Sequence, residues 1–252
     1  MKSLQQKISR RLSFYKSRLQ VNNPIVGRVV EILGDRVRMD GFVYSVASPQ
    51  ITRGHKSTLA FGLHEMEERE LIQRWLPSKT PILEFGGGLG VVSCLANSKL
   101  SKPERHVVVE ANPVMAEILE KNRTVNGCMF HVLNRAIAYD CDHINLNLDT
   151  EFVGSTIKSS AAQSVAVPTT TATDLMNSYG FDEAGIICDI EGAELDLIER
   201  EFRPLGDRIR FVMAEMHPTI LGKDVVDDLL RKLTALGFNM KQRIGDSVFL
   251  RR

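Results

Sequence analysis

The sequence lacks the features by which membrane proteins, nucleic-acid-binding proteins and disulfide-rich proteins are each recognised. Its 252 residues carry 32 basic and 31 acidic side chains, so the formal net charge is only +1, and aromatic residues make up 6%. A nearly neutral chain with few rings for base stacking does not favour a nucleic-acid partner. No apolar run approaches the roughly 18 residues that a transmembrane helix requires, and no signal peptide is recognisable. We therefore expect a soluble protein.

Cysteine is also scarce, and its four positions match no disulfide or zinc-binding pattern. The sequence contains no Cys-x-x-Cys pair and no histidines at zinc-finger spacing. The cysteines lie in apolar stretches, where a reduced thiol behaves as a small hydrophobic side chain. They are Cys94, Cys128, Cys141 and Cys188. This usage is typical of a reducing compartment, so we expect a cytoplasmic protein.

The length, with 43% hydrophobic residues, favours one large domain with a short extension. Residues 1–20 carry six basic side chains and no acidic one, which predicts a basic amphipathic helix. Such a helix can make peripheral contact with an anionic membrane, but packing on the main domain or fraying is the interpretation that we favour. Residues 26–46 alternate apolar and polar side chains, which predicts a β-meander. The extension is expected over residues 1–57.

From residue 62 onward, segments with helix and strand patterns alternate. Strands are expected over 81–85, 105–110, 128–133, 184–190, 208–216, 238–244 and 247–252, and helices over 62–76, 90–100, 112–127, 194–202 and 225–236. Apolar strands alternating with helices predict a doubly wound parallel α/β sheet, which we assign to residues 58–252. Only Gly245 and Asp246 separate the last two strands, so these must form an antiparallel hairpin. The irregular stretch 139–172 predicts a hairpin or a mobile loop.

A glycine-rich turn, Glu84-Phe85-Gly86-Gly87-Gly88-Leu89-Gly90, follows the first of these strands. The dinucleotide fingerprint Gly-x-Gly-x-x-Gly would need a third glycine where Val91 stands, and no Gly-Lys-Ser/Thr of a phosphate-binding loop follows. The pattern that fits is acid-x-Gly-x-Gly-x-Gly at the carboxyl end of a strand, where open parallel sheets bind ligands. Without Cβ atoms, the turn lets a ligand lie against the backbone. The alternative is that the glycines serve only packing.

Two carboxylates indicate the kind of ligand. Glu110 ends the second strand, 20 residues beyond Gly90, where it can accept hydrogen bonds from ribose hydroxyls. Glu84 on the first strand suits a ligand with an ammonium group and a sulfonium, and it would repel a pyrophosphate. An acid at the position of Glu110 occurs in both nucleotide-binding and S-adenosylmethionine-binding sheets, so it is Glu84 that favours S-adenosylmethionine over a nicotinamide dinucleotide.

Four titratable side chains are expected at the carboxyl ends of the fourth and fifth strands, and we predict that they are catalytic: Asp189, Glu191, Glu215 and His217. Side chains alternate along a strand, so Asp189 and Glu191 point to the same side, as do Glu215 and His217. Three crowded carboxylates are costly unless they share a proton or bind a cation. The alternatives are a general base of raised pKa and a Mg²⁺-type site on Asp189, Glu191 and Glu215. We favour the metal-free base, with Glu215 and His217 as an orienting pair.

Several of these residues also have a structural alternative. Glu191 and Glu194 can stabilise a helix N-terminus through the macrodipole, and Asp189 can cap that helix. Glu65 and Glu68, on the helix before the first strand, can simply form its solvated face.

Over about residues 58–217 the chain resembles the FkbM-type S-adenosylmethionine-dependent methyltransferases. The resemblance rests on Glu84 to Gly90, on Glu110-Ala111-Asn112-Pro113 and, most specifically, on Asp189-Ile190-Glu191-Gly192-Ala193-Glu194. It implies a Rossmann-like class I methyltransferase sheet with an antiparallel last strand. By resemblance, Glu84, Gly86 and Gly88 face the methionine part, Glu110 the ribose, and Asn134-Arg135-Ala136 the adenine. The expected cofactor-binding residues are Glu84, Gly86, Gly88, Gly90, Glu110, Ala111, Asn134, Ala136 and Asp189.

The resemblance implies methyl transfer to a hydroxyl group of a saccharide or natural product. An alcohol acceptor must be positioned and must lose its proton, which the four titratable residues can arrange. N-methylation of an amine or protein side chain is one alternative, although "DIEG" lacks the Asn/Asp-Pro-Pro-Tyr/Phe motif typical of methylation of amino groups on bases. A non-catalytic scaffold that binds S-adenosylmethionine is the other.

Overall fold

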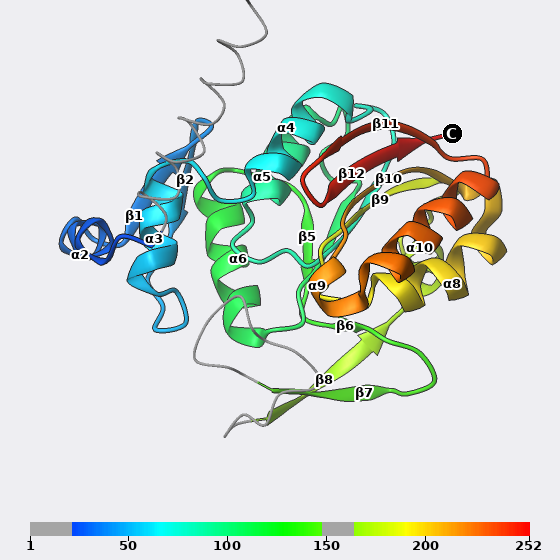
Figure 1. Cartoon of the computed structure of the whole chain (residues 1–252). Helices are drawn as coiled ribbons and strands as arrows, with labels where there is room; N and C mark the ends of the chain where they lie inside the picture. The colour runs from blue at the N-terminus through cyan, green and yellow to red at the C-terminus, as the bar shows by residue number, and fades with distance from the viewer. Residues whose placement is uncertain (1–21, 148–163) are drawn as a thin grey trace, which may run out of the picture.

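The structure is a computed structural model that describes residues 22–147 and 164–252 (Figure 1). The basic segment 1–20, predicted to be an amphipathic helix, lies outside the described residues. The described chain is built on a seven-stranded sheet with the strand order β11-β12-β10-β9-β3-β4-β5. Within these two ranges, no helix is both long enough and apolar enough to cross a membrane.

The central sheet is parallel except at one strand. Its strands are β3 (Ile82–Phe85), β4 (His106–Val109), β5 (His131–Leu133), β9 (Ala184–Cys188), β10 (Ile209–Glu215), β11 (Asn239–Ile244) and β12 (Ser247–Arg251). The five strands β3, β4, β5, β9 and β10 pair in parallel, whereas β12 is antiparallel to both β10 and β11. The predicted doubly wound, Rossmann-like sheet with an antiparallel last strand is therefore confirmed.

Helices cover both faces of the sheet, as Figure 1 shows. One face carries α7 (Ala172–Ser178), α8 (Glu194–Leu205) and α10 (Lys223–Ala235), and the other carries α4 (Met66–Trp75), α5 (Val91–Lys99) and α6 (Pro113–Val125). Successive side chains of β3 alternate between these two faces. Leu83 and Phe85 pack in the hydrophobic core beneath α7, α8 and α10, whereas Ile82 packs in the core beneath α4 and α5. Two short helices, η2 (Gly206–Arg208) and α9 (Pro218–Leu221), complete the connections on either side of β10.

The middle strands pack so closely that one of their positions requires glycine. All five residues of β9 are buried, which explains why its sequence is continuously apolar. A Cβ atom at Gly185 would lie 1.9 Å from Cε1 of Phe211 on the neighbouring strand. The Phe211 ring in turn stacks on Phe249 of β12, with centroids 5.3 Å apart and an interplanar angle of 12°.

The extension before the main domain is partly helical, which corrects the predicted meander. Residues 26–32, expected as a strand, belong to α2 (Pro24–Ile32). The Asn23 side chain accepts hydrogen bonds from the N–H groups of Ile25 and Val26, and Pro24 occupies the first turn, so a local helix start overrides the alternating pattern. The hairpin of β1 (Arg36–Met39) and β2 (Phe42–Ser45) does form around Asp40 and Gly41. A further helix, α3 (Arg53–Ala60), was not predicted and crosses the expected boundary at residue 57.

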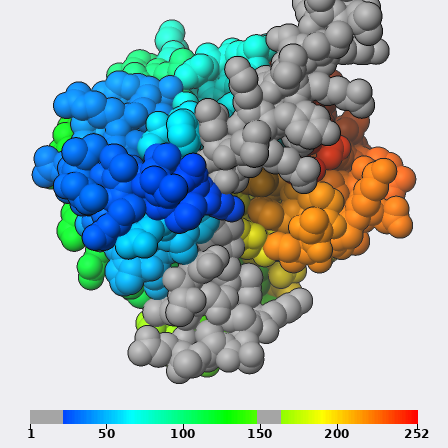
Figure 2. Space-filling model, turned by 60° about the vertical axis from the view of Figure 1, so that its left-hand side comes forward, coloured from blue at the N-terminus to red at the C-terminus, as the bar shows by residue number. Residues whose placement is uncertain are grey.

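The hairpin is fastened to α6 by two asparagines. Asn122 is fully buried, and it accepts a hydrogen bond from the N–H of Ser45 at 2.7 Å and donates one to the carbonyl of Leu89 at 2.8 Å. One turn later, Asn126 accepts from and donates to the backbone of Val43 at 2.8 and 2.9 Å. In Figure 2 the described N-terminal elements, in blue, and the α9–α10 segment, in orange, lie on opposite sides of the same face of the molecule.

A small second sheet lies apart from the main one, in the order β6-β8-β7. Its strands are β6 (Ala136–Ile137), β7 (His143–Asn147) and β8 (Ser164–Thr170), and β7 and β8 are antiparallel. Of the two alternatives for the stretch 139–172, the structure therefore supports a hairpin within the residues that it describes.

We expect Asn122→Ala to lower the free energy of unfolding by about 2 to 4 kcal/mol, since it strands the N–H of Ser45 and the carbonyl of Leu89 without partners in a buried place. Urea unfolding measures the change. Asn239→Ala is the control, because that side chain is exposed and its hydrogen bond to the carbonyl of Gly237 is long, 3.4 Å. Equal stability of the two variants would contradict a fastening role for Asn122.

Candidate active site

The carboxyl ends of the parallel strands bring the predicted site residues to one edge of the sheet. Phe85, the last residue of β3, pairs with Val109 of β4 on one side and with Cys188 of β9 on the other. The pairing extends one residue further, since the N–H of Gly86 bonds to Val109 and that of Asp189 bonds to Phe85, both at 2.9 Å. The glycine turn, Glu110 and Asp189 therefore lie next to one another, as the sequence predicted.

The glycine turn has the backbone that only glycine adopts easily, but much of the space beside it belongs to the protein. Gly86, Gly88 and Gly90 have φ angles of 86°, 51° and 82°. A Cβ atom at Gly86 would lie 1.8 Å from the carbonyl oxygen of Asp189, and one at Gly90 would lie 2.7 Å from Leu119. At these two positions the missing side chains make room for neighbouring chain segments rather than for a ligand, which corrects our expectation.

Glu84 does not point beyond the end of its strand. Its side chain is only 1% exposed; the Ser93 hydroxyl donates to Oε1 at 2.5 Å, and Nε2 of His106 lies 2.9 Å from Oε2. The reason is the direction of the side chain, which points from β3 toward α5 instead of beyond the end of the strand. The predicted contact of Glu84 with the methionine part of a cofactor is therefore corrected: this carboxylate links α5, β3 and β4.

Glu110 anchors the glycine turn. Its two carboxylate oxygens accept hydrogen bonds from the N–H groups of Gly88 and Asn112, both at 2.8 Å. Burial raises the pKa of the Glu110 carboxyl, and these two N–H groups oppose the rise. The two carboxylate oxygens have four lone pairs between them, which is more than the neighbouring backbone N–H groups occupy. The geometry is compatible with the predicted ribose contact.

The residues expected beside the adenine hold the end of β4. The Asn134 side chain donates to the carbonyls of Glu110 and Ala111 at 2.8 and 2.9 Å. Ala136 is buried at the start of β6. Asn134 therefore contacts Glu110, and Ala136 packs near Ala111, the next residue. The contact of Asn134 and Ala136 with an adenine stays a prediction.

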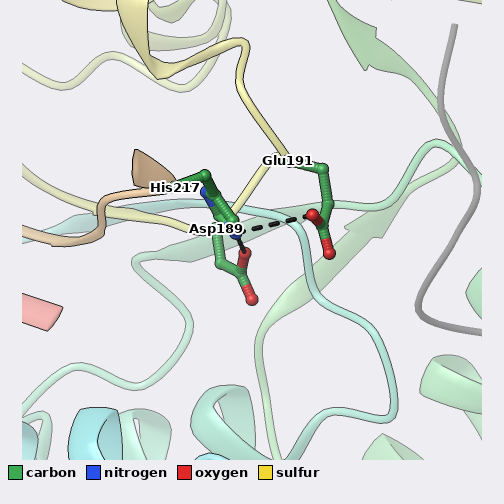
Figure 3. Close-up of side chains that lie close together, drawn as sticks. All are labelled: Asp189, Glu191 and His217. Carbon is green, nitrogen blue, oxygen red and sulfur yellow. Dashed lines mark ion pairs between the residues drawn. The ribbon is translucent and has the colours of Figure 1, made fainter. Parts of the chain in front are cut away.

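Three of the four predicted catalytic residues meet around one imidazole (Figure 3). Nε2 of His217 lies 3.3 Å from Oδ1 of Asp189 and 3.6 Å from Oε2 of Glu191, and Nδ1 lies 3.1 Å from Oε1 of Glu194. Burial opposes the charged form of the ring, but the Asp189 and Glu194 carboxylates outweigh it and raise the pKa of His217 to about 11. Burial also raises the pKa of Glu191, whose backbone has the left-handed φ of 51°.

Glu215 belongs to the same edge but not as the expected partner of His217. The described residues contain no ion pair between the two, because β10 ends at Glu215 and His217 starts α9, so the strand alternation that we assumed does not continue. Burial, together with the charges of Asp189 and Glu68, raises the pKa of Glu215 to about 8. The predicted orienting pair is therefore wrong, although the four groups do converge.

Glu194 has a larger role than the predicted stabilisation of a helix N-terminus. It is fully buried at the first residue of α8 and accepts hydrogen bonds from the N–H groups of Ile190 at 2.9 Å and Gly192 at 2.8 Å. It thereby fixes the turn that carries Glu191 and lies beside His217. Asp189 does not cap α8, whose N-cap is Ala193 without a side-chain bond. The third acid of the "DIEGAE" segment was the available signal for this role.

A solvated helix face was one interpretation of Glu68, but the side chain is buried. Its side chain is covered where α4 packs on β12, and the Ser247 hydroxyl donates to it. Burial raises the pKa of Glu68 to about 7, and the charges of Glu65 and Asp189 add to the rise. The acidic residues at this edge of the sheet therefore include Glu68 of α4, whose burial the helical pattern did not indicate.

We expect Glu68→Gln to stabilise the protein increasingly as the pH rises from 5 to 8. The folded pKa of Glu68 is raised above its ordinary value of 4.5 to about 7, so its favourable contribution is full below 4.5 and is lost as the pH rises through 7. The gain of the variant over the wild type should grow by about 2 to 3 kcal/mol. Gln retains an oxygen for Ser247. Urea unfolding in chelator measures this difference in the free energy of unfolding, and Glu104→Gln, at an exposed position, is the control. A difference that does not change with pH would contradict a raised pKa of Glu68.

We expect Gly86→Ala to lower the free energy of unfolding by at least about 2 kcal/mol, because its Cβ would clash with the carbonyl of Asp189. Gly180→Ala is the matched control: Gly180 also has a positive φ, 62°, but open space around it. A Gly86→Ala protein as stable as this control that had lost ligand binding would instead support a turn shaped directly by a ligand.

No family model and no curated protein matches the chain. Several solved structures are similar to it. A precorrin-6y methyltransferase from Geobacter metallireducens is 11% identical, with 82% of this chain and 91% of that chain covered and a TM-score of 0.44. An O-methyltransferase from Bacillus cereus in complex with SAH is 13% identical, with coverages of 74% and 81% and a TM-score of 0.44. Fibrillarin from Aeropyrum pernix, with bound S-adenosyl-L-methionine, is 13% identical, with coverages of 74% and 73% and a TM-score of 0.42.

These values are too low to carry an argument about activity or ligand. The fold rests on the strand order of the protein itself, and the resemblance to FkbM-type methyltransferases stays a prediction.

Proposed function

We propose that the protein is an S-adenosylmethionine-dependent methyltransferase that methylates a hydroxyl group of a small acceptor. The observation that carries the proposal is the position of Glu110, at the end of β4 and bonded to the glycine turn. A carboxylate at this place suits the two hydroxyls of a ribose. The acidic cluster around His217 follows the neighbouring strands, so a nucleoside bound at Glu110 would lie beside it.

The glycine turn favours a ligand without a diphosphate. In a dinucleotide-binding turn, backbone N–H groups face the phosphates. Here the N–H of Gly88 donates to Glu110 at 2.8 Å, so a carboxylate already stands where a phosphate would need a donor. Negative charges so close together repel each other, which disfavours NAD and is compatible with the cationic sulfonium ligand.

S-adenosylmethionine, when bound, supplies a methyl group on a good leaving group. The task of the chain is then to place the acceptor oxygen in line and to take up or share its proton. Asp189, Glu191 and Glu215 provide oxygens for both tasks beside the cofactor edge. Glu194 and the turn that it fixes hold these groups in place.

Within this proposal, the FkbM-type motifs favour a hydroxylated saccharide or natural product as acceptor. The most specific motif, "DIEGAE", is also the segment whose three acids surround His217. The sequence motif and the spatial cluster therefore coincide, which supports a shared chemical role for them.

Calorimetry should detect binding of S-adenosylhomocysteine, the demethylated product, but not of NAD. Glu110→Ala should weaken this binding by about 1 to 3 kcal/mol, or roughly 5- to 150-fold, because the ribose hydroxyls lose an acceptor and Gly88 loses its anchor. Glu104→Ala, an exposed carboxylate away from the site, should bind as the wild type does.

Labelled S-adenosylmethionine with pooled small-molecule extracts then tests the transfer itself, with the acceptor identified by mass. Tight binding of NAD would overturn the cofactor assignment. Binding of S-adenosylhomocysteine without transfer to any acceptor would favour the scaffold alternative over the enzyme.

A further inference from the structure

The cluster around His217 has the composition and spacing of a metal site. One atom each from Asp189, Glu191 and His217 lies within 4.8 Å of the other two. Two of these separations, from Nε2 of His217 to Oδ1 of Asp189 and to Oε2 of Glu191, are 3.3 and 3.6 Å. Ligand atoms about 2.1 to 2.2 Å from a shared ion stand roughly 3 Å or more apart, so the three atoms need little movement to coordinate one.

The burial of the cluster points the same way. His217 is nine-tenths buried, and Oδ1 of Asp189 is also buried. Among the described residues, this oxygen has Nε2 of His217 at an ion-pair distance of 3.3 Å but no hydrogen bond. A buried carboxylate oxygen without a donor is costly, and a cation removes that cost. Glu191 is about one-third exposed, so its side leaves the site accessible to an ion and to an acceptor.

A third carboxylate is placed as the outer partner that metal-bound histidines have. Oε1 of Glu194 lies 3.1 Å from Nδ1 of His217, on the other side of the ring from Asp189 and Glu191. The negative charge of a carboxylate beside Nδ1 favours a proton on that nitrogen, which leaves Nε2 to bind the metal. Glu194 is itself fixed by the N–H groups of Ile190 and Gly192.

The local charge is also unbalanced in favour of a cation. Asp189, Glu191 and Glu194 lie at ion-pair distance from one imidazole, and Glu215 interacts electrostatically with Asp189 and Glu191. No lysine or arginine within residues 22–147 and 164–252 forms an ion pair with any of these four carboxylates. Like charges in a partly buried place repel strongly unless a counter-charge is bound.

We infer that Asp189, Glu191 and His217 bind one divalent cation. This replaces the Asp189, Glu191 and Glu215 set considered from the sequence, because His217 and not Glu215 contacts both carboxylates. One nitrogen and two oxygen ligands suit Mn²⁺ better than Mg²⁺, which prefers oxygen alone. The remaining positions are open to water or to an oxygen of the acceptor, which the ion would hold and make more acidic. The binding stands by itself, whereas this role in methylation rests on the proposed function.

Mn²⁺ binding to the chelator-treated full chain tests the site, with free Mn²⁺ measured by electron paramagnetic resonance. The wild type should bind one ion. His217→Ala and Glu191→Gln should each weaken binding at least tenfold, and Glu215→Gln should weaken it less than His217→Ala does. The matched controls His143→Ala and Glu104→Gln change exposed residues away from the cluster and should bind as the wild type does.

Circular dichroism checks that each variant is folded, and Glu191→Gln, at a partly exposed side chain, decides the case if His217→Ala does not fold. No stoichiometric binding by the wild type, or equal binding by wild type and Glu191→Gln, would overturn the site. Calorimetry with S-adenosylhomocysteine in chelator runs in parallel. Mn²⁺ binding without S-adenosylhomocysteine binding would support the metal site and reject the proposed function, and the opposite result would reject the metal site alone.

Discussion

The pairing of β3 with β4 and β9 is the constraint on which the candidate site depends. Because Phe85 pairs with both Val109 and Cys188, the residues that follow these three strands come together at one edge. The contact there is so close that the backbone of Asp189 occupies the place of a side chain at Gly86. A glycine at this position therefore sets the distance between the glycine turn and the backbone of Asp189. A shift of either strand by one residue would reverse which side chains face each core.

Several carboxylates lie at the same edge, and different groups of the protein offset the cost of burying their charges. Backbone N–H groups bind Glu110 and Glu194, whereas a hydroxyl serves Glu68. Asp189 and Glu191 have instead the ring of His217 at ion-pair distance. Buried charges of this kind are costly compared with apolar packing, and such cost is typical of places that a protein uses for binding or chemistry. Asp189 and Glu191, which lack backbone or hydroxyl donors of this kind, are the carboxylates for which we propose a bound cation.

Much of the fold was determined by local patterns that are visible in the sequence. The continuous apolar run of β9, the cap and proline that start α6, and the two-residue connection before β12 predicted their elements correctly. Each signal depends on neighbours in the chain, so it survives in the folded protein. Where two local signals competed, as at α2, the cap at Asn23 prevailed over the alternation that predicted a strand.

The roles of individual acids, in contrast, were decided by the tertiary structure. The sequence determined that Glu84, Glu110, Glu194 and Glu215 stand at or near strand ends and helix starts. Only the packing of α5 on β3 turned Glu84 inward to Ser93 and His106. Only the end of β10 at Glu215, followed by α9, placed the His217 ring beside Asp189, Glu191 and Glu194 instead of Glu215. Such outcomes depend on which side chain from a distant segment fills the adjacent space, and spacing along one chain carries no information about that. The sequence thus determined which chemistry is available at the edge of the sheet, and the fold decided which groups meet there.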